Sequence, residues 1–474
     1  MDVQLFEQAR QARDPRFDGR FFIGVRTTGV YCRPVCPVKI PMAKNVTFFE
    51  SAAAASEAGF RPCLRCRPET SPGTPAWMGT STTVCRALRL ISEGALDEDS
   101  VEALGDRLGV GTRHLSRLFS QHLGASPKAV AQTRRLHFAK KLLDETDLSV
   151  TDIALSSGYR SVRRFNDHFK NVYDRTPSSV RKKAPARQTS GFQLKLTYRP
   201  PFDFTGVLAF LGVRAVPGVE VVTGEQYSRT ICVGDEVGYL NITDNAEGRC
   251  LNVHIELGEA TYLFVVLEKV KRLFDLTADP IEISQSFNDD PTMAKIAAQN
   301  PGQRVPGSWD PFEIAVRAIV GQQISVKGAT TVMGRIAKMY GTESGMGLCF
   351  PTPEALSLLD ITTLSMPVKR AQAIKDMSRA VAKGELDLGA SHEPEVLVTQ
   401  LVGIKGIGPW TAQYIAMRAV NDPDAFLHGD LVLLKVAKAV FNIDNDKDLL
   451  DRSNIWRPWR AYAGMHLWRQ ATSI

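Results

Sequence analysis

The sequence predicts a multidomain α+β protein: a small cysteine-rich domain, an all-α domain, a mixed α/β domain and a second all-α domain. Three observations lead to this prediction. The chain has 474 residues, which at roughly 100–200 residues per domain corresponds to about three or four domains. Two stretches indicate linkers: 70–81 is uncharged and rich in Pro, Gly, Ser and Thr, and 181–191 is basic and lacks apolar periodicity. Near residue 300 the apolar pattern changes from alternating to helical. We therefore place the domains at 1–70, 80–182, 191–300 and 301–474.

The composition is that of an ordinary soluble protein, with 44% hydrophobic and 23% charged residues. No stretch approaches ~18 uninterrupted apolar residues, which excludes a membrane span. The first twenty residues are charged and lack the apolar core of a signal peptide. We therefore expect a cytoplasmic protein without membrane partners. In that reducing compartment, eight cysteines indicate metal ligands or reactive thiols before disulfides.

Positive charge is concentrated in the first part of the chain. Residues 1–187 hold 30 Lys and Arg against 19 Asp and Glu, whereas the remainder holds 28 against 32. A basic part of this kind favours binding to a polyanion. The second part has to be judged by its motifs, because its bulk charge indicates no partner.

Four cysteines of the first domain form two closely spaced pairs, Cys32-Arg-Pro-Val-Cys36 and Cys63-Leu-Arg-Cys66. Zinc prefers four soft ligands at tetrahedral angles, and pairs of this spacing provide them locally. We predict one zinc ion per chain on these thiols, with a disulfide or chance spacing as the alternatives. Basic neighbours, Arg33 and Arg67 among them, suit a surface that faces phosphates or one that only solubilises the module. The remaining cysteines should pack in the core; they are Cys85, Cys232, Cys250 and Cys349.

An internal repeat predicts two helix-turn-helix units in 100–180. Ser100-Val101 and Gly109 recur 49 residues later as Ser149-Val150 and Gly158. Each unit would be a short helix, a glycine-containing turn and a second helix. The second helices carry side chains that can pair with base edges in the major groove of DNA: Arg113, Arg117, Arg163, Arg164 and Asn166. The alternative is a pair of helical hairpins with solvated basic faces.

The second half of the chain changes character along its length. Period-two alternation in 192–198 and 250–256 predicts half-buried strands. From Pro311 onward apolar residues recur every three or four positions, which predicts a mainly helical 308–474.

A glycine-rich turn stands out in the helical part, within Leu401-Val-Gly-Ile-Lys-Gly406-Ile-Gly408-Pro-Trp410-Thr-Ala-Gln-Tyr414. Glycines let the backbone pass close to a phosphate, and the amides at the start of the following helix point toward it. Asp430 follows 22 residues after Gly408. The turn alone is weak evidence for a functional site. The turn together with a carboxylate 22 residues later is strong evidence for one.

The residues of the first two domains resemble known families. Asp14-Pro-Arg-Phe-Asp-Gly-Arg-Phe, Val25-Arg-Thr-Thr-Gly-Val-Tyr-Cys32 and Gly59-Phe-Arg-Pro-Cys63-Leu-Arg-Cys66 resemble the zinc domain of the Ada adaptive-response proteins, over about 5–69. That resemblance implies that Cys32 accepts a methyl group from a DNA methylphosphotriester. Zinc keeps a thiol deprotonated and therefore nucleophilic. Residues 85–182 resemble an AraC-type DNA-binding domain, with Gly158-Tyr-Arg-Ser and Thr176-Pro177 at the expected places.

The remainder, about 192–474, resembles AlkA-type 3-methyladenine glycosylases of the helix-hairpin-helix superfamily. Besides the glycine turn, the resemblance includes Arg214-Ala-Val-Pro-Gly-Val-Glu, Ile319-Val-Gly-Gln-Gln-Ile-Ser and Trp456-Arg-Pro-Trp-Arg-Ala-Tyr. It implies a mixed α/β N-terminal glycosylase subdomain and an all-α helix-hairpin-helix domain, with Asp430 as the catalytic carboxylate. It also implies a hairpin that holds a phosphate, a base pocket and a wedge that fills the gap left by a flipped base. The residues are Gly406 and Gly408 for the hairpin, Trp410, Tyr414 and Trp468 for the pocket, and Gln323 and Ile324 for the wedge.

Two departures from the helix-hairpin-helix pattern carry chemical meaning. Relatives that also cut the strand have a lysine where this chain has Trp410, so the resemblance implies a monofunctional glycosylase. No cysteine follows Cys349, so the iron–sulfur cluster of some relatives is not expected. His428 lies two residues before Asp430 and should be a loop residue. The alternative is that His428 tunes the Asp430 carboxylate.

These observations predict a bifunctional protein of the alkylation-damage response, a phosphotriester-sensing transcription regulator fused to a 3-methyladenine-type glycosylase. Its partners would be double-stranded DNA, both alkylated and promoter DNA, and RNA polymerase during activation, and we expect a monomer. Two alternatives stay open. The glycosylase-like half could only bind DNA in an activator, or the first half could only tether a repair enzyme to DNA.

Overall fold

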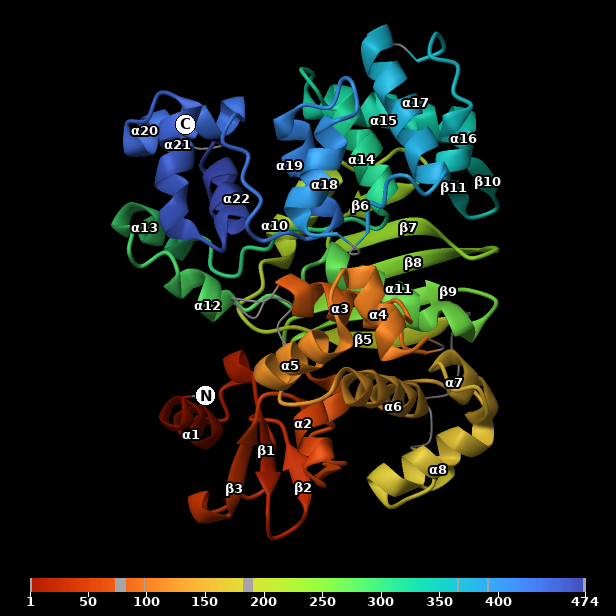
Figure 1. Cartoon of the computed structure of the whole chain (residues 1–474), viewed down its shortest axis with the longest axis vertical. Helices are drawn as coiled ribbons and strands as arrows, with labels where there is room; N and C mark the ends of the chain where they lie inside the picture. Colours follow the sequence, from red (N-terminus) through yellow and green to blue (C-terminus); the bar gives the residue numbers. More distant parts are fainter. Residues whose placement is uncertain are drawn as a thin grey trace. The chain divides into compact units, whose positions relative to one another are not determined.

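The computed structural model describes residues 2–72, 82–97, 99–181, 191–364, 366–389 and 392–471. Most of both predicted linkers, 73–81 and 182–190, therefore lies outside the described residues. The chain divides into two compact units (Figure 1). The first unit contains 1–200, 245–268 and 276–278, and the second contains 201–244, 269–275 and 279–474. Each is described by itself. Within the described ranges, no helix is long and apolar enough to cross a membrane.

The first unit begins with a small α/β module. Helix α1 (Val3–Ala12) precedes a sheet with the strand order β3-β1-β2-β4, and α2 (Ala52–Glu57) follows β3. The strands are β1 (Phe22–Val25), β2 (Val30–Cys32), β3 (Val46–Phe49) and β4 (Arg61–Pro62). Strands β2 and β4 run parallel, with Tyr31 opposite Pro62. This register places Cys32 beside Cys63, the residue after β4, and so brings the two cysteine pairs together.

Helices α4 to α9 form the predicted duplicated helix-turn-helix. The first motif is α4 (Val101–Leu108) and α5 (Thr112–Leu123), and the second is α7 (Val150–Ser156) and α8 (Val162–Tyr173). The long helix α6 (Pro127–Glu145) joins them, α3 (Thr82–Ser92) precedes them and α9 (Pro177–Val180) follows. The repeated serines Ser100 and Ser149 both cap helices by accepting hydrogen bonds from backbone amides. The repeated glycines Gly109 and Gly158 have φ of +70° and +78°, which favours glycine at both turns.

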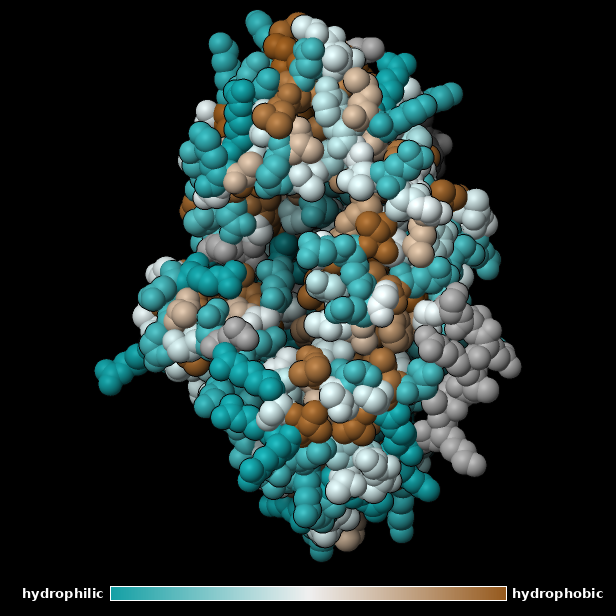
Figure 2. Space-filling view, turned by 90° about the vertical axis from the view of Figure 1, so that its right-hand side faces the viewer, coloured by the Kyte–Doolittle hydropathy of each residue, from teal (hydrophilic) through white to brown (hydrophobic). Residues whose placement is uncertain are grey.

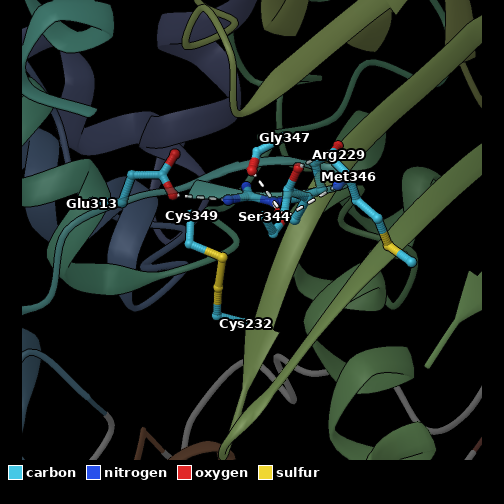
Figure 3. Close-up of a disulfide and its surroundings, with 8 residues drawn as sticks. Arg229, Cys232, Glu313, Ser344, Met346, Gly347 and Cys349 are labelled. Atoms are coloured by element: carbon cyan, nitrogen blue, oxygen red, sulfur yellow. Dashed lines mark hydrogen bonds and ion pairs between the residues drawn. A yellow bond between two sulfur atoms is a disulfide. The ribbon is translucent and has the colours of Figure 1, made fainter. Parts of the chain in front are cut away.

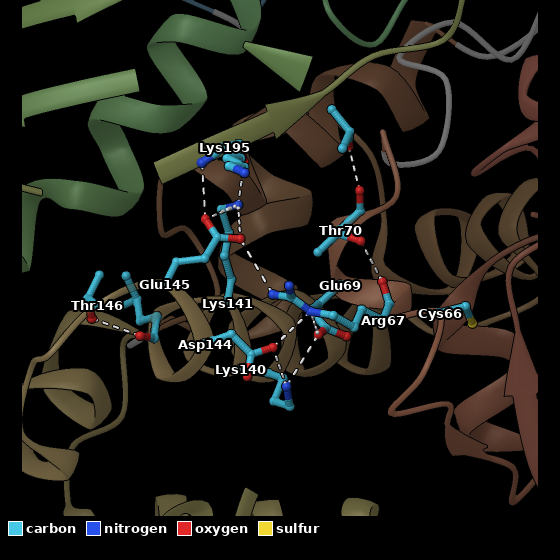
Figure 4. A network of polar contacts seen from close by, with 12 residues as sticks. Cys66, Arg67, Glu69, Thr70, Lys140, Lys141, Asp144, Glu145, Thr146 and Lys195 are labelled. Atoms are coloured by element: carbon cyan, nitrogen blue, oxygen red, sulfur yellow. Dashed lines mark hydrogen bonds and ion pairs between the residues drawn. The ribbon is translucent and has the colours of Figure 1, made fainter. Parts of the chain in front are cut away.

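A polar network joins the cysteine-rich module to α6 (Figure 4). The Arg67 guanidinium lies 2.8 Å from the carboxylate of Asp144, which also pairs with Lys140 at 2.6 Å. The network continues through Glu145, whose Oε2 accepts a hydrogen bond from the backbone amide of Lys195. The side chains of Glu69 and Asp144 are 1% exposed and that of Lys140 is 3% exposed. Charges buried this deeply are costly unless each has a partner in good geometry. The network therefore disfavours other positions of α6 against the cysteine-rich module, because they would leave these charges unpaired.

The first unit also contains the two predicted half-buried strands, which pair with one another. Strands β5 (Phe192–Thr197) and β9 (Cys250–Glu256) are antiparallel, with Phe192 opposite Ile255. Their burial alternates as the sequence pattern predicts. In the second unit, β6 (Glu220–Thr223), β7 (Gln226–Val233) and β8 (Glu236–Asn245) form an antiparallel meander after α10 (Phe204–Gly212).

The rest of the second unit is mainly helical, as predicted. Helix α14 (Pro311–Val320) packs against α15 (Val326–Tyr340), α17 (Val368–Ala382) and α19 (Pro409–Ala419). The sequence predicted one apolar face for α14, but every residue from Phe312 to Val320 is buried. The other helices are α11 (Leu263–Leu273), α12 (Pro280–Gln285), α13 (Pro291–Gln299), α16 (Pro353–Ser357), α18 (Pro394–Val402), α20 (Leu431–Phe441), α21 (Asp446–Ser453) and α22 (Arg460–Gln470). The face drawn in Figure 2 is largely hydrophilic, with hydrophobic residues in small groups.

One expectation about the cysteines was wrong. Cys232 on β7 and Cys349 form a disulfide across 117 residues instead of packing as free thiols (Figure 3). Cys349 lies on β11 (Gly347–Cys349), which pairs with β10 (Thr342–Ser344) in a hairpin that the sequence did not predict. The backbone amide of Leu348 donates to the carbonyl of Gly218 at 2.8 Å. The hairpin is thereby held at the meander, and the two cysteines meet only because of this tertiary contact. Cys250 is buried as predicted, and Cys85 is half-buried.

Breaking the Cys232–Cys349 disulfide should lower the free energy of unfolding of the second unit by about 3–5 kcal/mol, because a bridge that closes a loop of this length restricts the unfolded chain. Urea unfolding of the full chain with and without reductant measures the difference. The Cys349→Ser variant is the control, since its unfolding midpoint should not respond to reductant. A wild-type midpoint that reductant leaves unchanged would contradict the prediction.

Candidate metal centre, DNA-reading helices and carboxylate site

The four predicted zinc ligands form one cluster. The sulfur atoms of Cys32, Cys36, Cys63 and Cys66 all lie within 4.8 Å of one another, and the four residues are 6–8% exposed. Zinc–sulfur bonds of about 2.3 Å at tetrahedral angles require sulfurs at similar separations. Four thiols with no carboxylate among them are the donor set of a structural zinc site. The cluster therefore fits a zinc ion.

Arg33, between the first two cysteines, closes one side of the cluster. Its backbone amide donates to Cys66 Sγ at 3.3 Å, and its Nη1 donates to the Cys66 carbonyl at 3.1 Å. The guanidinium also pairs with Asp18 and is 12% exposed. Arg67 is likewise occupied by Glu69 and Asp144. The expectation that Arg33 and Arg67 belong to a phosphate-facing surface is thus wrong, because both are used in internal ion pairs.

The two predicted recognition helices have the same burial pattern. On α5, Arg113 and Arg117 are exposed while Leu115 and Phe119 are buried. On α8, the corresponding exposed residues are Arg163 and Arg164, and the buried ones are Phe165 and Phe169. Asn166 is half-buried. Both helices thus use one face for the core and leave the basic face accessible, as a DNA-reading pair requires.

Asp430 is the N-cap of α20, and N–H donors surround its carboxylate. Oδ1 accepts hydrogen bonds from the backbone amides of Val432 and Leu433, both at 3.0 Å. Two indoles complete the shell: Trp468 donates Nε1–H to Oδ1 and Trp410 donates Nε1–H to Oδ2, both at 3.1 Å. Aspartate is a favoured N-cap because its oxygens satisfy free amides of the first turn. The local sequence therefore fixes the carboxylate, and the fold brings both tryptophans to it.

Aromatic rings extend from these two indoles. Trp410 stacks on Tyr414 on the same face of α19, with ring centroids 5.4 Å apart at 13°. Trp468 on α22 lies parallel to Phe210 on α10, at 6.5 Å and 24°. Two of the three predicted pocket residues, Trp410 and Trp468, thus contact Asp430 directly, and the third, Tyr414, is connected to it through Trp410. The sequence analysis missed Phe210, because nothing in the sequence links it to Trp468, which lies 258 positions later in the chain.

Behind Tyr414 lies a buried group of cations that the sequence analysis also missed. Burial alone raises the pKa of the Tyr414 phenol, but three guanidinium groups lower it by more, so the pKa lies below its ordinary value. They belong to Arg214, Arg317 and Arg418, which come from three separate elements. Arg418 donates to the phenol oxygen at 2.9 Å and to the carbonyl of Gly307 at 2.8 Å. The three arginines help to line a cavity of about 30 Å³, enough for one or two water molecules.

The predicted hairpin connects α18 to α19. Gly406 has φ of +98°, and a β-carbon there would lie 3.1 Å from the β-carbon of Ala373, so the fold favours glycine for both reasons. Gly408 is the N-cap of α19 and offers no side chain to its first amides. A helix start left open in this way suits a phosphate oxygen. His428 lies in the turn before Asp430, as predicted.

The predicted wedge residues lie in the loop between α14 and α15. Gln323 and Ile324 are both exposed. Gln323 has φ of +54°, an uncommon conformation for a residue other than glycine.

Comparison with known proteins accounts for nearly the whole chain. Four families match successive segments: "Metal binding domain of Ada" at 6–69, "Helix-turn-helix domain" at 104–183, "AlkA N-terminal domain" at 193–310 and "HhH-GPD superfamily base excision DNA repair protein" at 316–461. A Mycobacterium tuberculosis protein named "Probable bifunctional transcriptional activator/DNA repair enzyme AlkA" is 40% identical over 98% of this chain and 96% of its own length. The chain belongs to this AlkA family of bifunctional proteins.

Other relatives match parts of the family architecture. "DNA-3-methyladenine glycosylase 2" of Escherichia coli is 33% identical over 58% of this chain and 95% of its own length. A solved 3-methyladenine DNA-glycosylase from Archaeoglobus fulgidus has a TM-score of 0.53 at 20% identity, and the match covers 59% of this chain and 98% of that one. At this identity the likeness shows a shared fold. The predicted combination of an Ada-type zinc domain, helix-turn-helix units and an AlkA-type half is therefore confirmed.

Cys36→Ala should lose the metal and unfold the cysteine-rich module, because metal binding supplies much of the folding free energy of such small sites. Metal content by mass spectrometry under native conditions, together with thermal melting, checks this. Cys85→Ala is the matched control: it removes a half-buried thiol outside the cluster and should retain one zinc per chain. A Cys36→Ala protein with unchanged zinc content and melting would rule out the zinc assignment.

Proposed function

We propose that this protein is a methylphosphotriester-sensing transcription regulator and a monofunctional glycosylase that excises 3-methyladenine-type bases from DNA. The single observation that carries the glycosylase half is the convergence of Trp410 and Trp468 on the Asp430 carboxylate. Helix capping alone accounts for the hydrogen bonds from Val432 and Leu433, but it does not require the two indoles at the carboxylate. The proposed domain boundaries are 1–70, 80–182, 191–300 and 301–474.

Excision starts with extrusion of the damaged base, since the bond to be broken is out of reach in the stacked duplex. Alkylation of a ring nitrogen makes the purine cationic and hence a good leaving group. The bond between base and sugar breaks, the base keeps the electron pair, and the sugar becomes oxocarbenium-like. Asp430 faces this cation or directs the attacking water. Because its oxygens are already oriented by N–H donors, little reorganisation is needed as the positive charge develops.

The aromatic rings select for the charge of the damaged base. The faces of Trp410 and Trp468 attract a cation by about 0.5–2 kcal/mol each, depending on desolvation, and the buried ring of Tyr414 supports Trp410 by stacking on it. Such a pocket tolerates several alkylated bases, since it responds to charge and not to one base edge. The protein does not form the Schiff base that strand-cutting relatives form, because Trp410 occupies the position of their lysine nucleophile.

For the first half we propose that Cys32 accepts a methyl group from a DNA methylphosphotriester. The thiolate attacks the methyl carbon, a carbon–sulfur bond forms, and the carbon–oxygen bond breaks with its electron pair left on the phosphate oxygen. The products are a thioether and an ordinary phosphodiester. Bound zinc would be held by Cys32, Cys36, Cys63 and Cys66 and would keep the thiol ionised. Support comes from the four-thiol cluster and from the match to the Ada metal-binding domain.

The remaining assignments concern partners. We propose that Arg113, Arg117, Arg163, Arg164 and Asn166 read promoter DNA, that Gly406 and Gly408 hold a phosphate of alkylated DNA, and that Gln323 and Ile324 form the wedge. We propose RNA polymerase as the partner in activation, a monomeric state and a cytoplasmic location. The exposed basic faces of α5 and α8 support the first of these.

Asp430→Asn should slow excision of 3-methyladenine by a factor of about 100 or more, because the side chain keeps its size but loses the charge that faces the sugar cation. Binding to an abasic-site analogue should stay nearly intact, since the hairpin and the wedge need no carboxylate. Single-turnover release of the base from a methylated duplex measures the first effect. Asp444→Asn, which alters an exposed carboxylate paired with Lys438, is the matched control.

Two results would contradict different parts of the proposed mechanism. Wild-type excision by Asp430→Asn would show that another group carries the chemistry. Strand cleavage at the abasic product by the wild-type protein would refute the monofunctional mechanism.

Methylation of Cys32 should strengthen binding to duplex DNA by a factor of about 3–10 at low salt, because the module loses one negative charge beside a polyanion. Affinity is measured at fixed low salt before and after incubation with an oligonucleotide that carries methylphosphotriesters, and the methylated peptide is identified by mass. Incubation with the same oligonucleotide lacking the triesters is the control. Equal affinity in both states would remove the switch and leave the methyl transfer itself standing.

A further inference from the structure

The loop that carries the proposed wedge is tied to the hairpin by one side chain. Gln322 lies just before Gln323, in the turn that follows α14. Its Nε2 donates one hydrogen bond to the carbonyl of Gly406 at 2.9 Å and another to Oγ1 of Thr411 at 3.0 Å. Gly406 belongs to the turn before α19, and Thr411 belongs to the first turn of that helix. One amide group therefore bridges the hairpin and connects it to a loop more than 80 residues earlier in the chain.

The chemistry of the partners fixes how this amide is oriented. A backbone carbonyl can only accept, so the nitrogen of Gln322 has to face Gly406. Both N–H groups of the nitrogen are then used by the two partners. Gly406 itself has φ of +98°, and a β-carbon at this position would lie 3.1 Å from that of Ala373, so the turn is closely packed at this residue. Thr411 is 3% exposed and cannot move away without disturbing its helix. Gln322 thus joins two rigid acceptors.

The backbone immediately after this anchor is strained and projects outward. Gln323 has φ of +54°, a conformation that persists in ordinary residues only where the surroundings determine it. On one side it is fixed by the Gln322 bridge, and on the other by Ser325, which caps α15 by accepting from the amide of Gly328 at 3.1 Å. Between these two anchors Ile324 is 40% exposed. An apolar side chain held outward on a fixed loop is suited to enter a base stack.

We propose that Gln322 is a positioning residue that couples the hairpin's hold on the DNA backbone to extrusion of the damaged base. With the bridge intact, docking of a phosphate on the hairpin places the wedge loop at a defined distance from the duplex. Without it, the hairpin can still bind the backbone, but Gln323 and Ile324 are free to move away from the stack. This inference deepens the proposed glycosylase function and rests on it.

A coupling role for Gln322 and a merely structural role predict different effects on paired and unpaired lesions. A base that is already unpaired costs less to extrude. Loss of the bridge should therefore harm excision of a paired lesion far more than excision of the same lesion in a bulge. A general loss of folding or a distorted pocket would harm both substrates alike.

The test uses the full-length chain with Gln322→Glu and Gln322→Met. Glutamate keeps the size of the side chain but has no N–H to donate and places negative charge against the Gly406 carbonyl, whereas methionine removes the hydrogen bonds without adding charge. The control is Gln299→Glu, an exposed glutamine of the same unit whose amide pairs with Gln470. Three quantities are measured: single-turnover excision of a paired alkylated adenine, excision of that base in a bulge, and the fluorescence rise of 2-aminopurine next to the lesion, which reports extrusion separately from chemistry.

We expect both Gln322 variants to excise the paired lesion about 10–100 times more slowly than wild type, with a matching loss of the extrusion signal. Excision from the bulge should stay within about threefold of wild type, affinity for an abasic duplex should change little, and Gln299→Glu should behave as wild type. Equal slowing on both substrates, or wild-type extrusion in the variants, would overturn the inference. If wild type extrudes the base but releases none, the proposed function fails, and the fluorescence comparison still decides the role of Gln322.

Discussion

The Asp430 carboxylate depends on hydrogen bonds from four N–H groups, and much of the second unit serves to deliver them. Two come from the start of α20, so the aspartate is also the cap of its own helix. The other two come from tryptophans on α19 and α22. These four donors fix the orientation of the carboxylate, which in the proposed mechanism faces the positive charge that develops on the sugar.

Further contacts in the same unit hold the helix that carries Trp468 against the loop that ends in Asp430. The segment before Asp430 is held to the start of α22 by Arg460, which forms a two-pronged ion pair with Asp424 at 2.8 and 2.9 Å. Such planar pairs fix orientation as well as distance. The backbone amide of Ala461 also donates to the carbonyl of Pro423 at 2.9 Å. The loop that ends in Asp430 and the helix that carries Trp468 are thus fixed to one another.

The first unit uses buried charge in a different way. The Arg67, Glu69, Lys140 and Asp144 network lies between the cysteine cluster and α6, with its carboxylates almost fully buried. Tyr31, the residue before Cys32, adds a hydrogen bond to His137 on the same helix at 2.9 Å. Burial lowers the pKa of His137 to about 4, so the imidazole is neutral at physiological pH and adds no charge to the network. Buried ion pairs add little net stability, but they penalise any other docking of the two surfaces.

The sequence by itself determined the features that depend on neighbours along the chain. The cysteine spacing, the serine and glycine pairs of the repeat and the glycine turn are local patterns, and each is present in the structure at its predicted residues. Only the tertiary structure decided what meets across the chain. The Cys232–Cys349 bridge, Phe210 beside Trp468, the arginines around Tyr414 and the Gln322 bridge all join residues from separate elements. Arg33 and Arg67 illustrate the same limit, since their charge is visible in the sequence but their carboxylate partners are not. Local patterns fix backbone conformation and ligand spacing, whereas the partner of a long side chain depends on how helices and strands pack, which one sequence does not state.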